Sequence, residues 1–212
     1  MTIVAISDTH NRHEAAVLPP GDSLIHARDF TGRGTPEEVE RFLRWFGALE
    51  YRMKILVVGN HDFLFEQSPG YAQRLIQEHA PGTIYLEDSS TVVEGFTFHG
   101  SPRTPRFYDW TFNVDRGENI RRYWDRIPAE TDVLITHGPP MGHRDLADGK
   151  HVGCEELRDR ITKLPRLKLH IFGHIHPGYG EELQDGVFYV NASVCDERYR
   201  PVNAPITINL SC

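Results

Sequence analysis

Cysteine is scarce in this sequence. The chain has three cysteines among 212 residues, and no two of them form a CxxC pair. Such wide spacing argues against a disulfide framework and against a zinc site built from thiolates. We therefore expect Cys154, Cys195 and Cys212 to be free thiols, either buried or terminal.

Long apolar runs are also missing. No run approaches the roughly 20 residues that a helix needs to cross a bilayer. The chain enters an expected strand directly, without the basic segment and apolar core of a signal peptide. We therefore expect a cytoplasmic protein that has no membrane partner.

Basic residues are outnumbered by acidic ones. The chain carries 23 Lys and Arg against 30 Asp and Glu, a formal net charge of -7. Tight binding of long nucleic acids depends on many Lys and Arg contacts with phosphates. The balance therefore argues against such a partner. No heptad pattern indicates an oligomer, and the oligomeric state stays open.

What the sequence does contain is a series of polar clusters, each of which follows a short aliphatic run. The clusters are Asp8-Thr9-His10, Asp29, Gly59-Asn60-His61-Asp62, Thr136-His137-Gly138 and Gly173-His174-Ile175-His176. Short runs rich in Val, Ile and Leu predict buried strands. Because α/β sheets assemble ligand sites where their strands end, we expect these polar side chains to converge.

The remaining pattern predicts an α/β fold and one domain over residues 1–212. Strands are expected at about 2–6, 23–27, 53–58, 132–136, 167–172, 187–191 and 205–210, and helices at about 36–49, 70–79, 117–126 and 153–163. A hairpin is expected over 92–98. Thr35 as N-cap and Pro36 as the first helical residue mark the start of the first helix. The order of elements predicts two facing mixed sheets flanked by helices.

The converging side chains favour a metal site. They offer carboxylate, amide and imidazole ligands without thiolate, a set that suits Mn, Fe or Zn better than Ca or Mg. Asp29 is a lone carboxylate that suits a bridge between two ions. Two ions about 3.5–4 Å apart can clamp the oxygens of a displacement at phosphorus, and they can lower the pKa of bound water from about 15.7 towards 7. No serine nucleophile is then needed.

Taken in order, the clusters resemble the calcineurin-like metallophosphoesterases over nearly the whole chain. The segments SPRTPRFYDWTFNVDRG and GHIHPGYG are most similar to the metallophosphoesterase-domain-containing subgroup. The resemblance implies a four-layer αββα sandwich of two mixed sheets flanked by helices. It also implies a dinuclear phosphodiesterase that acts on a small phosphoester or nucleotide, such as a cyclic nucleotide.

The resemblance implies two sets of metal ligands. One ion is expected on Asp8, His10, Asp29 and His176, and the other on Asp29, Asn60, His137 and His174. Mn is the first expectation for both ions, with Fe, Zn, Co and Ni as alternatives. A hydroxide that bridges the ions is implied as the nucleophile.

Four further side chains are expected to act on the substrate. His61 is implied as the general acid for the leaving alkoxide, a role that suits an imidazole because its ordinary pKa lies near neutrality. His61 and Asn60 are expected to contact the phosphate. Trp110 and Phe107 offer aromatic faces on which a base can stack, although they can equally cover the open side of the core.

Two departures from the family pattern stand out. Arg28 replaces the glycine that usually precedes the bridging aspartate, and Gly32 replaces an aspartate of the phosphoprotein phosphatases. Arg28 can distort the loop, weaken metal binding, point away or grip a substrate phosphate. It motivates an alternative, a low-activity or inactive nucleotide-binding or scaffold protein on the same fold. A nuclease is a third alternative, which the acidic balance disfavours.

The other histidines are expected to have no part in the site. Those inside expected strands are interpreted as structural, namely His26, His99 and His170. The rest are expected in loops or at the surface, namely His13, His79, His143 and His151.

Overall fold

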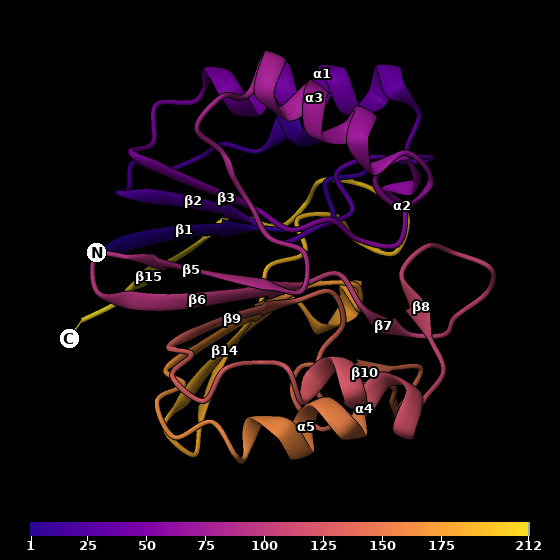
Figure 1. Ribbon diagram of the computed structural model, residues 1–212, viewed down its shortest axis with the longest axis vertical. Coiled ribbons are helices and arrows are strands. Elements are labelled where there is room, and N and C mark those ends of the chain that lie inside the picture. The colour runs from indigo at the N-terminus through magenta and orange to yellow at the C-terminus, as the bar shows by residue number, and fades with distance from the viewer. Residues whose placement is uncertain (212) are drawn as a thin grey trace.

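The computed structural model describes residues 1–211 and consists of four layers (Figure 1). Two sheets lie face to face, with α1 and α3 covering the outer face of one and α4 and α5 covering the outer face of the other. The predicted α/β sandwich of two mixed sheets is thereby confirmed. Cys212 lies outside the described residues.

The helices follow the sequence-based expectation closely, with one addition. Their bounds are α1 Pro36–Ala48, α2 Phe63–Gln67, α3 Pro69–His79, α4 Glu118–Trp124 and α5 Glu155–Ile161, and short 3-10 helices span His13–Ala15 and His176–Gly178. The sequence did not predict α2, because five residues are too few to show a helical period. Helix α1 begins with a capping box, in which the Thr35 hydroxyl accepts from the Glu38 amide.

The first sheet has the order β15-β1-β2-β3-β4. Its strands are β1 Thr2–Ile6, β2 Ser23–His26, β3 Met53–Leu56, β4 Ile84–Tyr85 and β15 Ile206–Asn209. Strands β1 to β4 run parallel, and β15 pairs with β1 in the antiparallel sense. The three longer parallel strands therefore all end at the same edge of the sheet.

The second sheet has the order β13-β14-β12-β9-β6-β5. Its strands are β5 Ser89–Val93, β6 Phe96–Ser101, β9 Val133–Thr136, β12 Leu169–Phe172, β13 Gly180–Gln184 and β14 Val187–Asn191. The four central strands are parallel and the two edge strands antiparallel. The edge strand β13 was not predicted, because it is largely exposed and shows no apolar alternation.

Two small paired segments stand apart from the main sheets. They are β7 Thr104–Pro105 with β8 Asn113–Val114, and β10 Leu146–Ala147 with β11 Lys150–His151. Both lie in long connections of the second half of the chain. No helix within residues 1–211 is long and apolar enough to cross a membrane.

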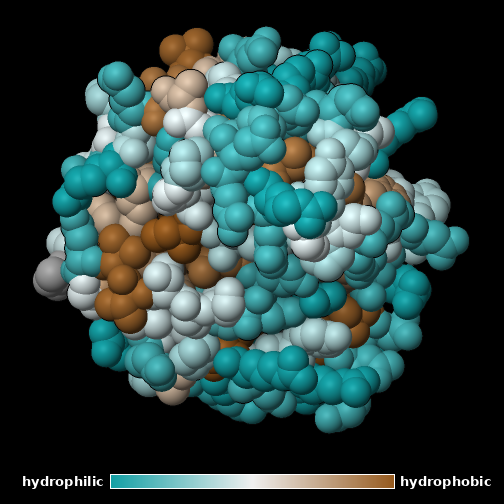
Figure 2. Space-filling model, turned by 45° about the horizontal axis from the view of Figure 1, so that its top comes forward, coloured by the Kyte–Doolittle hydropathy of each residue, from teal (hydrophilic) through white to brown (hydrophobic). Residues whose placement is uncertain are grey.

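Strand alternation divides the core into three apolar layers. On β1, Ile3 and Ala5 face the second sheet, whereas Val4 and Ile6 pack against the helices. Successive side chains of a strand point to opposite faces, so a strand buried on both sides is apolar throughout. Figure 2 shows the side of α1 and α3 brought forward, where most of the surface is hydrophilic and apolar residues form separate patches.

The two sheets converge where their parallel strands end. Ser7, directly after β1, forms a parallel bridge with Ser193, which follows β14 of the other sheet. A side chain at Gly173 would collide with the Asp8 carboxylate, because an added Cβ would lie 1.9 Å from Asp8 Oδ2. Only glycine permits this close approach of β12 to β1, which brings the polar clusters together.

His13 was expected in a loop or at the surface; it lies in the connection after β1, but it is not at the surface. Its side chain is fully buried beside the rings of Phe42 and Trp45, and neither ring nitrogen has a hydrogen-bond partner within the described residues. Burial, with a contribution from the charge of Arg41, lowers the pKa of His13 to about 4. The sequence missed this because residues of α1, which are distant in the chain, bury the ring.

The depressed pKa of His13 makes stability depend on pH. The contribution of His13 to the free energy of unfolding is complete when the pH is above about 6.5, its pKa in the unfolded chain. This contribution is lost as the pH falls towards about 4, its pKa in the folded protein. We expect the free energy of unfolding to fall between pH 7 and pH 5 in the parent. In His13→Phe, which keeps an aromatic ring but cannot bind a proton, this fall should be about 1 kcal/mol smaller. Urea denaturation at both pH values measures this. Equal losses would show that His13 does not titrate with unfolding.

Candidate metal centre

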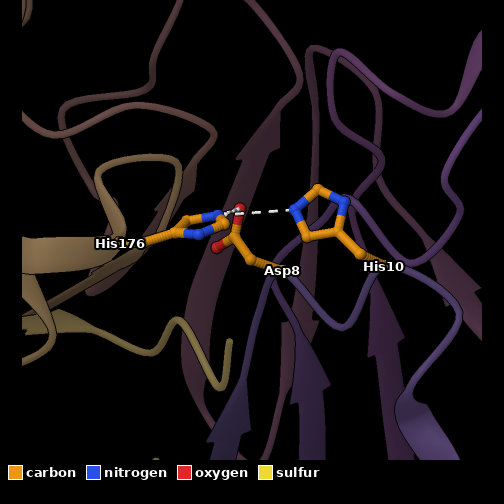
Figure 3. Close-up of side chains that lie close together, drawn as sticks. All are labelled: Asp8, His10 and His176. Carbon is orange, nitrogen blue, oxygen red and sulfur yellow. Dashed lines mark hydrogen bonds and ion pairs between the residues drawn. The ribbon is translucent and has the colours of Figure 1, made fainter. Parts of the chain in front are cut away.

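The first group of ligands consists of Asp8, His10 and His176 (Figure 3). One ligand atom from each lies within 4.8 Å of the others. The Nε2 atom of His176 is 3.5 Å from Asp8 Oδ1 and 3.4 Å from His10 Nε2. His10 and Asp8 come from the loop after β1, whereas His176 comes from the loop after β12, so each sheet supplies part of this group.

Backbone carbonyl groups fix the ring orientations of His10 and His176. His10 Nδ1 lies 3.3 Å from the carbonyl oxygen of Thr31, and His176 Nδ1 lies 2.9 Å from that of Asp196. A carbonyl oxygen can only accept, so Nδ1 carries the proton in each ring. The Nε2 atoms are then the ring nitrogens that lie beside Asp8, which is the arrangement that imidazole needs to bind a metal ion.

The Asp8 carboxylate is held by groups from the second sheet. The His174 amide donates to both carboxylate oxygens at 3.1 Å, and the Ser193 hydroxyl donates to Oδ2 at 2.8 Å. The Ser7 hydroxyl donates to the same oxygen. These bonds fix the carboxylate and join the two sheets at the site.

A second group consists of Asp29, His137 and His174, whose ligand atoms also lie within 4.8 Å of one another. His137 Nε2 is 3.7 Å from Asp29 Oδ2 and 2.8 Å from Asn60 Oδ1. The amide nitrogen of Asn60 and Nδ1 of His137 are buried without a partner within residues 1–211. The fully buried Asn60 thus directs its oxygen towards this group.

Asp29 also belongs to a third group with His10 and His61. Within residues 1–211, it is the carboxylate that shares one group of convergent ligand atoms with His137 and His174 and another with His10 and His61. Its Oδ1 accepts from the His61 amide at 2.9 Å, which fixes its orientation. Asp29 therefore lies between the two halves of the site.

Several site residues have backbone conformations that side chains rarely adopt. The φ angle is positive at Asp8, His10, Asp29 and His174, with values of 51°, 40°, 47° and 68°. Each such conformation costs free energy and persists because the surrounding bonds enforce it. The Asp8 amide donates to the Arg28 carbonyl at 2.7 Å, and the His10 amide donates to the Asp29 carbonyl at 2.9 Å.

The side chain of His61 is oriented by a backbone group. Its Nδ1 lies 2.9 Å from the carbonyl oxygen of Gly32, so this nitrogen donates its proton. The sequence shows glycine where phosphoprotein phosphatases carry an aspartate that orients the histidine, and here the Gly32 carbonyl takes that position. The ring packs against Trp110, with centroids 4.5 Å apart.

The loop that carries Asn60 and His61 is braced by Asp62. Its Oδ2 accepts from the Gly59 amide at 2.8 Å, and its Oδ1 accepts from the amide and hydroxyl of Thr31 at 3.1 Å and 2.7 Å. Burial and the charge of Asp29 raise the pKa of Asp62 to about 7. Asp62 thus ties the loop after β3 to the loop after β2.

Burial controls the charge of the histidine ligands. It lowers the pKa of His10 to about 3 and that of His174 to about 4, and it holds the pKa of His137 well below its usual range. For His176 burial acts in the same direction, but the hydrogen bond and charge of Asp8 outweigh it and raise the pKa to about 9. Three of these four imidazoles are thus kept neutral, the form that binds metals.

The two carboxylates respond in opposite directions. Burial raises the pKa of both, and for Asp29 the charge of Asp8 raises it further. At Asp8 the hydrogen bond and the charges of the histidines prevail, so its pKa lies well below the usual value. Two buried acids this close repel each other when both are ionised, a cost that bound cations remove.

The donor set fits two divalent cations. It contains two carboxylates, one amide oxygen and four imidazoles, and these belong to overlapping groups of convergent ligand atoms. Cys154 and Cys195 belong to none of these groups within the described residues. Oxygen and nitrogen ligands of this kind suit Mn, Fe or Zn.

A cavity of about 850 Å³ opens beside the ligands. Its wall includes His10, Asp29, His61, His174 and His176, together with Phe107 and Trp110. It also includes Tyr199, whose ring lies 4.7 Å from that of His10 and which the sequence did not indicate. No pattern could have revealed Tyr199, because it lies in a loop far from any predicted strand end.

Two residues expected to contact the substrate do not line the cavity. Asn60 is fully buried behind the ligands, and the Arg28 side chain is fully buried and donates to the Ser101 carbonyl at 3.0 Å. The expectation that Arg28 grips a substrate phosphate is therefore not met by this placement. His61, Phe107 and Trp110 do border the cavity.

Comparison with known proteins identifies the class. The Calcineurin-like phosphoesterase family matches residues 1–178, and the chain belongs to this family of metallophosphoesterases, which implies divalent metal ions. Human Metallophosphoesterase domain-containing protein 1 is 42% identical to this chain over an aligned length of 228 residues. The match covers 98% of this chain and 70% of the human protein. The mouse protein of the same name matches equally well. The resemblance found in the sequence is thus confirmed.

Solved structures share the fold at low sequence identity. The protein TT1561 of Thermus thermophilus has a TM-score of 0.60 at 12% identity, over 90% of this chain and 88% of that one. A structure described as a novel archaeal phosphodiesterase has a TM-score of 0.51 at 16% identity, over 92% and 85% of the two chains. These structures support the αββα architecture.

Removing the Asp62 carboxylate should loosen the loop that carries Asn60 and His61. Asp62→Ala leaves the buried amides of Gly59 and Thr31 without their acceptor, and each unsatisfied group costs about 1–3 kcal/mol. We expect a loss of about 3 kcal/mol in the free energy of unfolding, measured by urea denaturation.

The matched control for this substitution is Asp159→Ala, which removes an exposed carboxylate from α5. It should change the free energy of unfolding by less than about 0.5 kcal/mol. A loss in Asp62→Ala as small as in the control would show that the brace is not needed.

Proposed function

We propose that this protein is a dinuclear metal-dependent phosphodiesterase that acts on small substrates such as cyclic nucleotides. The observation that carries the proposal is the position of Asp29. It shares one ligand group with His137 and His174 and another with His10 and His61. A single carboxylate between two sets of imidazoles is the arrangement that a pair of bridged ions requires.

The proposed ligands divide between the two ions as the resemblance implies. One ion is held by Asp8, His10, Asp29 and His176, and the other by Asp29, Asn60, His137 and His174. Mn is our first expectation for both ions, with Fe, Zn, Co and Ni as alternatives. Bound in this way, the ions supply an activated water nucleophile and positive charge for the phosphoryl oxygens.

His61 is the proposed general acid. It borders the cavity, and its Nδ1–H donates to the Gly32 carbonyl. Nε2 is therefore the nitrogen that can give a proton to the leaving alkoxide when the ring is doubly protonated. The hydrogen bond and the contact with Trp110 hold the ring in one orientation, so no reorientation is needed when the bond breaks.

The cavity favours a substrate with an organic group beyond the phosphate. Its volume of about 850 Å³ is much larger than a phosphate requires, and Phe107 and Trp110 form an aromatic corner with centroids 5.4 Å apart. A planar base can stack there while the phosphate lies at the ligands. The shared fold of a protein described as an archaeal phosphodiesterase supports the choice of a diester.

Metal-dependent hydrolysis is the first test. Protein freed of metal by a chelator should not hydrolyse bis(p-nitrophenyl) phosphate, and Mn should restore activity, because both nucleophile activation and charge stabilisation depend on the ions. In His61→Gln, metal content measured by elemental analysis should match the parent, whereas kcat should fall about 10²- to 10⁴-fold.

The outcomes of this test separate the parts of the proposal. No turnover with Mn, Co, Ni, Fe or Zn would refute the enzymatic function. An unchanged kcat in His61→Gln would remove His61 from proton transfer and leave the metal-dependent reaction in place.

The role of Trp110 in base stacking is tested separately. Trp110→Ala should raise KM for cyclic AMP about 5- to 100-fold, as expected from about 1–3 kcal/mol for each stacked base. A cyclic ribose phosphate without a base should be affected much less. Tyr71→Ala, which removes an exposed aromatic residue of α3 that is not part of the cavity wall, is the control. An equal effect on both substrates would instead assign Trp110 to the support of His61.

A further inference from the structure

Arg28 occupies a position that is unusual for a charged residue. Its side chain is fully buried, and its backbone has a φ angle of 109°, in the region that favours glycine. It directly precedes Asp29, which we propose as the carboxylate shared by the two ions. The fold therefore holds a guanidinium group in the interior beside the candidate metal centre.

The contacts of Arg28 place it beside one of the two ligand sets. Its Nη2 donates to the carbonyl of Ser101, and Ser101 is paired across the sheet with Thr136, which precedes His137. At the other end of the side chain, a Cβ added at Gly59 would lie 2.9 Å from the Arg28 Cβ. Arg28 thus extends from the loop of Asn60 to the end of β6, which lies beside the end of β9 that precedes His137.

The positive charge of Arg28 is not neutralised by a direct ion pair. Its Nε and Nη1 atoms are buried without hydrogen-bond partners, and within residues 1–211 no carboxylate oxygen lies within the 4.0 Å of a salt bridge. Burial lowers the pKa of Arg28, opposed by the charges of Asp29 and Asp8, but arginine stays protonated in proteins. The electric field of an unpaired buried charge extends farther than that of a charge in water, because the protein interior has a lower dielectric constant.

From this geometry we propose that Arg28 is a fixed internal cation that weakens the binding of a divalent ion at Asn60, His137 and His174. The ion at Asp8, His10 and His176 is affected less. The inference rests on the metal centre of the proposed function, and it adds the order in which the two metal ions bind. One ion binds tightly, and the second binds only at higher metal concentration, so metal supply regulates the assembly of the complete site.

The test measures metal binding and does not depend on activity. The full chain, freed of metal, is titrated with MnCl2 by calorimetry, and paired Mn is detected by electron paramagnetic resonance. Arg28→Met removes the charge and keeps most of the bulk, Arg28→Lys keeps the charge, and Arg28→Gly removes both charge and backbone strain. Arg28→Gln is a second neutral variant in case Arg28→Met does not fold.

The control is Arg166→Met. Arg166 pairs with Asp132, which directly precedes β9 and so lies at the opposite end of this strand from His137. The variant therefore removes a guanidinium that lies away from the site. Its Mn binding should equal that of the parent.

In the parent we expect a second Mn that binds at least tenfold more weakly than the first. In Arg28→Met, Arg28→Gln and Arg28→Gly the second Mn should bind about tenfold or more tightly than in the parent, and the signal of paired Mn should appear at lower metal concentration. Arg28→Lys should behave as the parent does.

Three results would overturn the inference. Two Mn ions of equal affinity in the parent would do so while leaving the proposed function intact. Tightening in Arg28→Gly alone would assign the effect to backbone strain and not to charge. A complete absence of Mn binding in the parent and in all variants would refute the metal centre itself, and with it both proposals.

Discussion

The meeting of the two sheets at the Asp8 carboxylate is the constraint on which the rest of the site depends. Strand β1 of the first sheet delivers Asp8, and the His174 amide and Ser193 hydroxyl of the second sheet bind it. The ligand sets draw on both sheets, so neither set exists unless the sheets keep this position. Gly173 permits the close approach, and the apolar residues between the sheets stabilise it.

The architecture concentrates unfavourable features at this junction and compensates for them locally. Positive φ angles, two buried carboxylates and a buried guanidinium all occur within the loops after β1 and β2. Backbone hydrogen bonds between the loops, such as that from the Asp8 amide to the Arg28 carbonyl, hold these conformations. Bound cations would neutralise the repulsion between Asp8 and Asp29, so metal binding would stabilise this junction.

Much of the fold was predictable because strands that are buried on both faces appear in the sequence as short, continuous apolar runs. The runs of β1, β3, β9 and β12 are short, aliphatic and bounded by polar clusters, and each was located to within a few residues. Elements whose existence depends on neighbours were not predictable. Helix α2 is a single short turn, and β13 is an exposed edge strand that exists only because β14 lies beside it. His13 shows the same limit, because α1 and not the local sequence buries it.

By itself the sequence determined which candidate donor side chains follow the strands and in which order, because parallel strands deliver the residues that follow them to one edge of the sheet. It could therefore identify Asp8, Asp29 and His137 as convergent. Only the tertiary structure decided that Gly32 orients His61 through its carbonyl, that Tyr199 borders the cavity and that Arg28 is enclosed. Such relations depend on distances between segments far apart in the chain, and a linear pattern does not contain them.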